Sequence, residues 1–297
     1  MKAKKVFISY GDKNYFIQRH RIKFQAKSFN VFDDIKIYNP KNIDKTFKNR
    51  FSKVFKHSKG GGYWLWKSYL VLKTFESMNE GDILLYVDSG STLNLKGIDR
   101  LINYYELLES SNESLLMFRI KNMIDGHYLV EEEWTTKEVF KCLSVENNSE
   151  IKNSPQYMGG VFLAKKSNKS VQFFNSFLDI IDSDNNLITD FYNKNQENTY
   201  FKQGRHDQSI MSVMAKIEGC IHLDDENYFF ENPELQYKYP ILTVRDGKYN
   251  LWQKIKYYSL YPLNIRKIIY FGQKQHYFKR PSLAYRIYFK FLKFFQK

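Results

Sequence analysis

The sequence is poor in cysteine and in long apolar runs, and each shortage excludes a class of protein. Among 297 residues the only cysteines are Cys142 and Cys220, too few for a disulfide framework and suited to a reducing compartment. No run reaches the ~18 apolar residues of a membrane span, and the charged start MKAKKVFISYGD leaves too short an apolar stretch for a signal peptide. We therefore expect a cytoplasmic protein.

Several catalytic signatures are also missing. The sequence contains no GxGxxG dinucleotide loop, Walker loop, HExxH, paired CxxC or GxSxG element. Hydride transfer, zinc chemistry and serine hydrolysis therefore lose their usual sequence support. A hydrophobic content of 43%, with regular helix and strand patterns, indicates a globular chain rather than a disordered one.

Acidic residues are absent from the carboxyl-terminal part. Residues 247–297 contain 12 Lys and Arg and no Asp or Glu, whereas residues 1–246 hold 34 basic and 32 acidic side chains. Most of the net charge of +14 therefore belongs to this tail, in which 15 aromatic residues are interleaved with the cations. The pattern favours a helix in a membrane interface, and the alternatives are an oligomer interface or a nucleic-acid site. We divide the chain into a domain over 1–246 and an appendage over 247–297.

The most informative stretch is GGGYWLWKSYLVLKTFESMNEGDILLYVDSGS, from Gly60 to Ser91. Three glycines open it, and backbone without side chains can approach a ligand closely. Apolar spacing then predicts a helix from Trp66 that ends near 79–82, and the run over 83–87 predicts a strand buried on both faces. Asp88 follows this strand, and a carboxylate at the carboxyl end of a buried strand lies where open α/β sheets bind ligands.

The other patterns up to residue 246 alternate between strand and helix. Strands are predicted over 5–10, 31–38, 114–120, 161–164 and 221–223, and helices over 15–29, 97–110, 173–181 and from 207 onward. Alternation of this kind predicts an α/β domain with a mainly parallel central sheet and helices on both sides. Residues 41–59, rich in Lys and Arg, are either a solvated segment or a lid whose cations meet a diphosphate.

A second centre of polar residues opens the last long helix. His206, Asp207 and Gln208 come at the start of that helix, where backbone N–H groups are free to bind a ligand. The alternative to a functional role is that Asp207 only caps the first turn of this helix. Trp134 is predicted on an exposed loop, where it would stack against a sugar, or else as a core anchor. His222 is a lone histidine, which is more often structural than a metal ligand.

These motifs resemble bacterial polysaccharide glycosyltransferases of O-antigen and capsule assembly, which are GT-A enzymes that use nucleotide-diphospho-sugars. The resemblance covers roughly residues 1–230. It is carried by the run GYWLWK at 62–67, the strand that closes in Asp-Ser-Gly at 88–90, Trp-Thr-Thr-Lys at 134–137, a Gly-Gly turn at 159–160 before the strand over 161–164, and His-Asp-Gln-Ser at 206–209. It implies a GT-A-like fold and transfer of a sugar, first of all from a UDP-sugar, to a hydroxyl of a growing, lipid-linked surface polysaccharide. The enzyme would then work on the inner face of the cell membrane.

The resemblance also assigns roles to residues. Asp88 would hold Mn²⁺ or Mg²⁺ on the donor diphosphate, although Gly90 replaces the second acid of the usual Asp-x-Asp motif. Asp207, with His206 beside it, would act on the acceptor hydroxyl as a general base or an orienting group. The implied donor-binding residues are Tyr10, Gly11, Gly62, Tyr63, Trp64, Trp66, Lys67, Asp88, Ser89, Gly90, Trp134, Gly159, Gly160 and Gln208. The competing interpretation is a non-catalytic module that binds carbohydrate or nucleic acid and needs no carboxylate at position 88.

Overall fold

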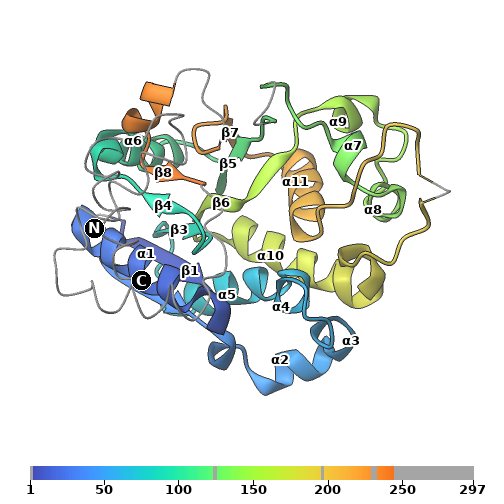
Figure 1. The fold of residues 1–297 in the computed structure, drawn as a ribbon, viewed down its shortest axis with the longest axis horizontal. Coiled ribbons are helices and arrows are strands. Elements are labelled where there is room, and N and C mark those ends of the chain that lie inside the picture. The colour runs from blue at the N-terminus through green and yellow to red at the C-terminus, as the bar shows by residue number, and fades with distance from the viewer. Residues whose placement is uncertain (1–2, 123–125, 195–196, 229–232, 244–297) are drawn as a thin grey trace, which may run out of the picture.

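A six-stranded sheet forms the centre of the domain (Figure 1). The computed structural model describes residues 3–122, 126–194, 197–228 and 233–243. The sheet has the order β2-β1-β3-β6-β5-β7, and β4 and β8 form a second, two-stranded sheet. The strands are β1 (Lys5–Tyr10), β2 (Asp34–Tyr38), β3 (Ile83–Val87), β4 (Thr92–Leu93), β5 (Leu115–Arg119), β6 (Tyr157–Lys165), β7 (Ile221–Leu223) and β8 (Ile241–Leu242).

The strand directions confirm the predicted fold class. β1 pairs in parallel with β2 and β3, and β5 pairs in parallel with β7. β6 lies between β3 and β5 and is antiparallel to both. One strand of the six therefore runs against the others, and the domain has a mainly parallel α/β fold.

Helices cover both faces of this sheet. Side chains along each buried strand point alternately to the two faces, so each strand contributes apolar residues to both. On one face, Leu84 and Tyr86 of β3 join a core cluster with residues of α5, α10 and α11. On the other face, Leu85 and Val87 join residues of α1 and α6. The helices are α1 (Phe16–Phe29), α2 (Lys45–Arg50), α3 (Ser52–Phe55), α4 (Gly60–Tyr63), α5 (Trp66–Phe75), α6 (Ile98–Glu109), α7 (Glu131–Trp134), α8 (Lys137–Cys142), α9 (Ser149–Asn153), α10 (Asn168–Ser183) and α11 (Asp207–Glu218).

Two sequence predictions need correction. The glycines at 159 and 160 were expected in a turn before a strand, but both lie within β6. A Cβ on Gly159 would lie 3.0 Å from Gln208 and one on Gly160 would lie 2.8 Å from Asp88, so neither position has room for a side chain. Residues 41–59 are a solvated segment only in part: they contain α2 and α3, whose Phe47, Phe51 and Val54 are buried in the core, while cations such as Lys53 and Lys56 are exposed.

The short sheet holds residues 236–242 against the loop after β3. Asn94 Nδ2 donates to the carbonyl oxygens of Gln236, Tyr237 and Tyr239 at 3.3, 3.2 and 2.9 Å. A Cβ on Gly97 would lie 2.3 Å from the carbonyl carbon of Tyr239, so only glycine allows this approach. The predicted appendage over 247–297 lies outside the described residues.

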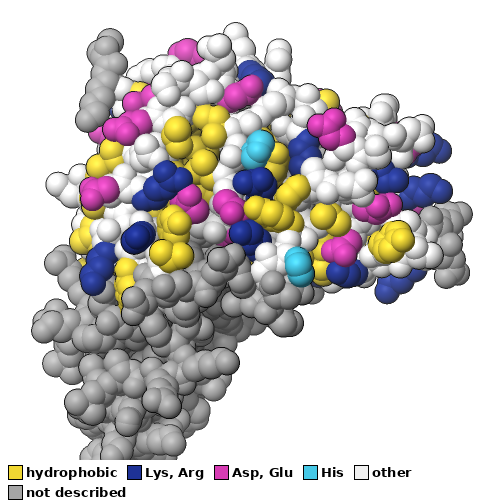
Figure 2. All heavy atoms as spheres, turned by 90° about the horizontal axis from the view of Figure 1, so that it is seen from above, with side chains coloured by type: hydrophobic (Ala, Val, Ile, Leu, Met, Phe, Trp, Pro, Cys, Tyr) yellow, Lys and Arg dark blue, Asp and Glu magenta, His cyan; other side chains and the backbone are white. Residues whose placement is uncertain are grey.

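The charge of the described domain is mixed. On the face shown in Figure 2, Lys and Arg side chains are interspersed with Asp and Glu rather than gathered in one field. This agrees with the near balance of 34 basic and 32 acidic residues before position 247. Among the helices of the described ranges, none has the length and apolarity that a bilayer crossing requires.

Candidate active site

The candidate site begins where the chain order of the sheet reverses. From β1 the chain passes through α1 to β2 on one side, and then returns to β3 on the other side of β1. Such a switch point leaves a crevice outside the carboxyl ends of the two strands. Gly11 follows β1 and Ser89 follows β3. A Cβ on Gly11 would lie 3.0 Å from Ser89 Oγ, so the two strand ends adjoin.

Asp88 lies at this junction and is half-buried, and both its carboxylate and its backbone N–H are hydrogen-bonded. Its Oδ1 accepts a hydrogen bond from the Tyr86 hydroxyl at 2.5 Å. Its backbone N–H donates to the Gly160 carbonyl at 2.8 Å, and a Cβ on Gly160 would lie 2.8 Å from Asp88 Oδ2. Burial raises the pKa of Tyr86 well above its ordinary value, so this phenol remains a proton donor to the carboxylate.

A buried ion pair lies behind Asp88. The ammonium of Lys67, on α5, donates to Asp207 Oδ2 at the start of α11 and to the carbonyl oxygen of Gly159 on β6 at 2.7 Å. Asp207 is only 5% exposed. Burial raises the pKa of Asp207 to about 6, and the attraction of Lys67 opposes part of that rise. Asp207 does not cap α11 with its side chain, because it is the first helical residue and its carboxylate binds Lys67.

The glycine-rich segment forms a left-handed turn. Residues 60 to 64 all have positive φ, from 50° at Tyr63 to 95° at Gly62. A Cβ on Gly62 would lie 2.8 Å from Phe55, so this glycine makes room for a side chain of the core. Gly61 instead faces the site: its nearest neighbours are Trp66 Nε1 and the Tyr10 hydroxyl.

Tyr10 and Trp66 form one wall of the site. Their rings stack with centroids 3.7 Å apart, and Trp66 Nε1 donates to the Gly60 carbonyl at 2.8 Å. Trp66 is therefore both a residue of the core cluster and a link between β1 and the glycine turn.

His206 packs against the same turn. Its ring lies 5.0 Å from that of Tyr63 and 5.5 Å from that of Trp64. His206 Nδ1 lies 2.9 Å from the Ile188 carbonyl, so this nitrogen carries the proton, and Nε2 lies 3.6 Å from Asp190 Oδ1. Burial lowers the pKa of His206, which makes the ring neutral near pH 7.

Tyr63, Trp64 and His206 share a costly backbone conformation. Their φ values are 50°, 61° and 56°, in a region that residues with a Cβ seldom adopt. Strain of this kind persists only where the surroundings hold it, and it gathers at ligand sites.

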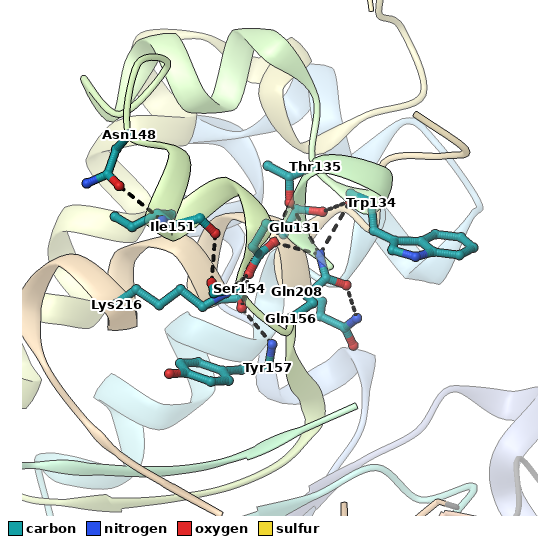
Figure 3. A network of polar contacts seen from close by, with 12 residues as sticks. Glu131, Trp134, Thr135, Asn148, Ile151, Ser154, Gln156, Tyr157, Gln208 and Lys216 are labelled. Atoms are coloured by element: carbon teal, nitrogen blue, oxygen red, sulfur yellow. Dashed lines mark hydrogen bonds and ion pairs between the residues drawn. The ribbon is translucent and has the colours of Figure 1, made fainter. Parts of the chain in front are cut away.

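Gln208 connects the site to a buried carboxylate (Figure 3). Gly159 N donates to Gln208 Oε1 at 3.0 Å, and Gln208 Nε2 donates to Gln156 Oε1 at 2.6 Å. Gln156 Nε2 then donates to Glu131 Oε2 at 3.0 Å. Glu131 is fully buried, and Lys216 Nζ lies 2.5 Å from its other oxygen.

Sequence reasoning missed Glu131, Gln156 and Lys216. The acidic run at 131–133 reads as a solvated segment, and no periodicity marks its first residue as buried. No local pattern marks Lys216 either, because its partner Glu131 lies 85 residues away in the chain.

Of the two positions predicted for Trp134, the core anchor fits the structure better than the exposed loop. Trp134 ends α7, is half-buried and packs against the core cluster that contains Leu85 and Val87. The Arg205 guanidinium lies 4.0 Å from the centroid of its ring, so a cation occupies the face that a sugar would use. His222 stacks on Tyr157 at 5.6 Å, away from the Asp88 junction.

The donor atoms around Asp88 suit a cation that is shared with phosphate. Mg²⁺ at phosphate sites is held by one or two carboxylates, with phosphate oxygens and water completing the shell. Asp88 can supply one such carboxylate, and Lys67 already neutralises Asp207. The described residues contain no group of three or more His, Cys, Asp or Glu that could hold a metal ion. The site therefore fits a metal brought with a diphosphate better than an all-protein metal cage.

Comparison with known proteins gives matches among solved structures only. No protein-family model matches the sequence, and no curated protein does. A glycosyltransferase involved in the glycosylation of the major capsid of PBCV-1 is 11% identical over 80% of this chain and 93% of its own, with a TM-score of 0.43. Mouse xyloside xylosyltransferase 1 is 8% identical over 76% and 87%, with a TM-score of 0.44.

The bifunctional glycosyltransferase WbbM is a third similar structure. It is 13% identical over 90% of this chain and 51% of its own, with a TM-score of 0.48. At TM-scores below 0.5 and identities of 13% or less, these likenesses do not assign a function to this chain.

The burial of Glu131 predicts that replacing it lowers the unfolding free energy more than replacing the nearby Glu133 does. Glu131→Gln leaves the Lys216 ammonium buried without a counter-charge, and we expect it to lower the unfolding free energy by about 3–5 kcal/mol. Glu133→Gln is the matched control, because its ion pair with Lys202 is solvent-exposed and contributes less than about 1 kcal/mol. Urea denaturation measures both. Equal effects of the two changes would show that Glu131 is not a buried, charged anchor.

The raised pKa of Asp207 predicts a pH-dependent stability. An aspartate with a pKa of about 6 when folded and an ordinary value of 3.8 when unfolded adds stability below pH 3.8, and this is lost as the pH rises through about 6. Relative to Asp207→Asn, the wild type should lose about 2 kcal/mol of unfolding free energy between pH 4 and pH 7. Urea denaturation of both proteins at several pH values tests this. If the wild type instead gains unfolding free energy over Asp207→Asn as the pH rises, the attraction of Lys67 outweighs the effect of burial on the pKa of Asp207.

Proposed function

We propose that the chain is a glycosyltransferase that moves a sugar from a nucleotide-diphosphate donor to a hydroxyl group of a glycan. The observation that carries this proposal is the junction of Gly11, Asp88 and Gly160 at the carboxyl ends of β1 and β3. The two glycines let the surrounding chain close tightly around this junction, and the Asp88 carboxylate, held by Tyr86, lies where open α/β sheets bind ligands. The GYWLWK resemblance supports the same class of reaction.

The nucleoside would lie beside the Tyr10–Trp66 stack, with Gly61 leaving room for it. The diphosphate would then reach Asp88, where a divalent cation, when bound, would neutralise the charge of the leaving group. Asp88 is the residue that would hold it. Lys67, whose ammonium is hydrogen-bonded to Asp207 and to the Gly159 carbonyl, would add a fixed positive charge near the diphosphate.

In the proposed reaction the bond between the anomeric carbon and the phosphate oxygen breaks, and its electron pair leaves with the diphosphate. The acceptor oxygen forms the new bond to that carbon and gives up its proton. We assign this proton to Asp207, which is ionised at neutral pH because its pKa of about 6 lies below 7. Lys67 orients the carboxylate and keeps it in place.

The first test is binding of the donor's nucleotide. We expect UDP with Mn²⁺ to raise the Tm of the wild type by about 5 °C at a concentration near 100 Kd, because it binds only the folded protein. Asp88→Asn should lose this shift, whereas Asp99→Asn, an exposed acid at the start of α6, should keep it. GDP, CDP and CMP are tested in parallel to identify the base.

The outcomes of this screen separate the alternatives. A shift that needs no metal would keep the transferase but remove Asp88 as a metal ligand. No shift with any nucleotide would contradict the proposed function and favour a non-catalytic carbohydrate-binding or nucleic-acid-binding module.

We also propose that the acceptor is a lipid-linked surface polysaccharide and that residues 247–297 hold the enzyme on the inner face of the membrane. The support is the composition of this segment, with 12 cations, no acids and many aromatic residues. Each Lys or Arg near an anionic leaflet adds about 1 kcal/mol to binding.

The membrane proposal predicts a charge-dependent affinity for vesicles. The full chain should sediment with vesicles that contain phosphatidylglycerol and not with pure phosphatidylcholine, because Lys and Arg need anionic headgroups. Lys290→Glu/Lys293→Glu should weaken binding at least about tenfold. The matched control, Lys23→Glu/Lys27→Glu on α1, changes the net charge equally and should bind as the wild type does. Equal loss in both variants would contradict a specific role of the tail.

A further inference from the structure

The buried face of α1 is polar where it meets the loop after β3. Gln18, Arg21 and Gln25 follow helical spacing along this face, and all three are buried. Ile22 and Phe29 of the same helix belong to the apolar core cluster beside them. A buried guanidinium is costly unless its N–H groups are bonded, so the partners of Arg21 show what this polar face does.

Arg21 holds the turn that carries Asp88. Its Nη2 donates to the carbonyl oxygens of Ser89 at 3.2 Å and of Ser91 at 2.7 Å, and both contacts are buried. The Ser91 N–H donates to the Asp88 carbonyl at 2.9 Å, so residues 88–91 form a closed turn. Buried carbonyl groups outside helices and strands need a donor, and here one guanidinium nitrogen serves two of them.

Gln25 extends this hold by one helical turn. It lies four residues after Arg21, and its Oε1 accepts a hydrogen bond from the Leu93 N–H at 3.2 Å in another buried contact. Leu93 belongs to β4, the strand that follows the turn. Two neighbouring side chains of α1 therefore fix the whole segment between the end of β3 and β4.

Asp88 depends on this segment for its direction. One carboxylate oxygen is bonded to Tyr86, and its backbone is bonded to Gly160 on one side and, through the turn, to Arg21 on the other. Because Gly90 carries no second acid, no other carboxylate of the turn can replace Asp88 if it rotates away. A ligand group binds best when the residues around it fix its orientation before the ligand arrives.

We propose that Arg21 is a positioning residue, which fixes the 88–91 turn so that the Asp88 carboxylate meets the divalent cation on the donor diphosphate. Gln25 assists by holding Leu93 at the end of the same segment. The role of Asp88 rests on the proposed function, whereas the hold of Arg21 on the turn can be measured without any ligand.

Hydrogen exchange of single backbone amides, followed by NMR on the full chain, tests the hold itself. The matched control is Arg100→Met, which removes a half-buried guanidinium from α6 that binds Glu226 and Asn103 instead of the turn. We expect the Ser91 amide to exchange at least about tenfold faster in Arg21→Met than in Arg100→Met, because only the first change opens the turn. Equal rates in the two variants would mean that Arg21 acts on global stability alone.

The Mn²⁺ requirement tests the positioning of Asp88. At one fixed UDP concentration, the Mn²⁺ concentration that gives half of the rise in Tm should be at least about tenfold higher in Arg21→Met than in the wild type. Arg21→Lys keeps the charge and a donor, so we expect an increase of only about threefold. Arg100→Met should keep the wild-type requirement even if its Tm is lower. A lower Tm with an unchanged Mn²⁺ requirement in Arg21→Met would overturn the proposal.

A second variant keeps the test valid if Arg21→Met does not fold. Gln25→Met leaves Arg21 in place and removes only the acceptor of the Leu93 N–H. We expect faster exchange of the Leu93 amide and a rise of about threefold in the Mn²⁺ requirement. Wild-type values of both quantities in Gln25→Met and in Arg21→Lys would contradict the positioning role.

The two readouts also distinguish this inference from the function on which it rests. If no nucleotide raises the Tm of the wild type, but the protection of the Ser91 amide still needs Arg21, the transferase proposal fails and the hold on the turn stands. If UDP binds with the same Mn²⁺ requirement in every variant, the positioning role fails alone.

Discussion

The ammonium of Lys67 lies where three distant parts of the chain meet. It comes from α5, it pairs with Asp207 on α11, 140 residues further along, and it donates to the Gly159 carbonyl on β6. A lysine that is 2% exposed must have its charge and its hydrogen bonds satisfied, because an unpaired ammonium is costly inside a protein. The positions of α11 and of β6 next to β3 are therefore linked to one cation, and Asp88 lies against the strand that this cation holds.

A second buried ion pair, between Glu131 and Lys216, fixes the other end of α11. Glu131 binds Lys216 further along α11 and, through Gln156 and Gln208, reaches the backbone of Gly159. α11 is thus anchored to its surroundings by an ion pair at its start and another near its end. Both pairs are buried, so they set geometry more than they add stability. A site that must hold a carboxylate against a departing diphosphate needs fixed charges of this kind.

The strained turn adds a different constraint. Five consecutive residues with positive φ would be unfavourable in isolation, and the last two, Tyr63 and Trp64, have side chains that make this costlier. Their rings pack on His206, and Trp66 ties the turn to Tyr10. The turn is therefore held between β1 and the residue that precedes α11.

Local patterns in the sequence determined much of the fold. The apolar run Ile83–Val87 and the spacing from Trp66 predicted β3 and the start of α5, because strand and helix periods are properties of neighbouring residues; α5 ends at Phe75, before the predicted stop near Asn79. The position of Asp88 at the end of a buried strand, and of Asp207 at the start of a helix, followed in the same way. The sequence also placed most of the net charge in residues 247–297.

Only the tertiary structure decided which of these residues meet. Nothing local shows that Lys67 pairs with Asp207, that Glu131 is buried while Glu133 is not, or that Trp134 is covered by Arg205. The glycines at 159 and 160 read as a turn because glycine favours turns, yet they lie in β6, where Asp88 and Gln208 come too close for a side chain. Pairings between residues far apart in the chain, and the burial that results, depend on how the layers pack. Side-chain packing between elements leaves no periodic trace in the sequence of either one.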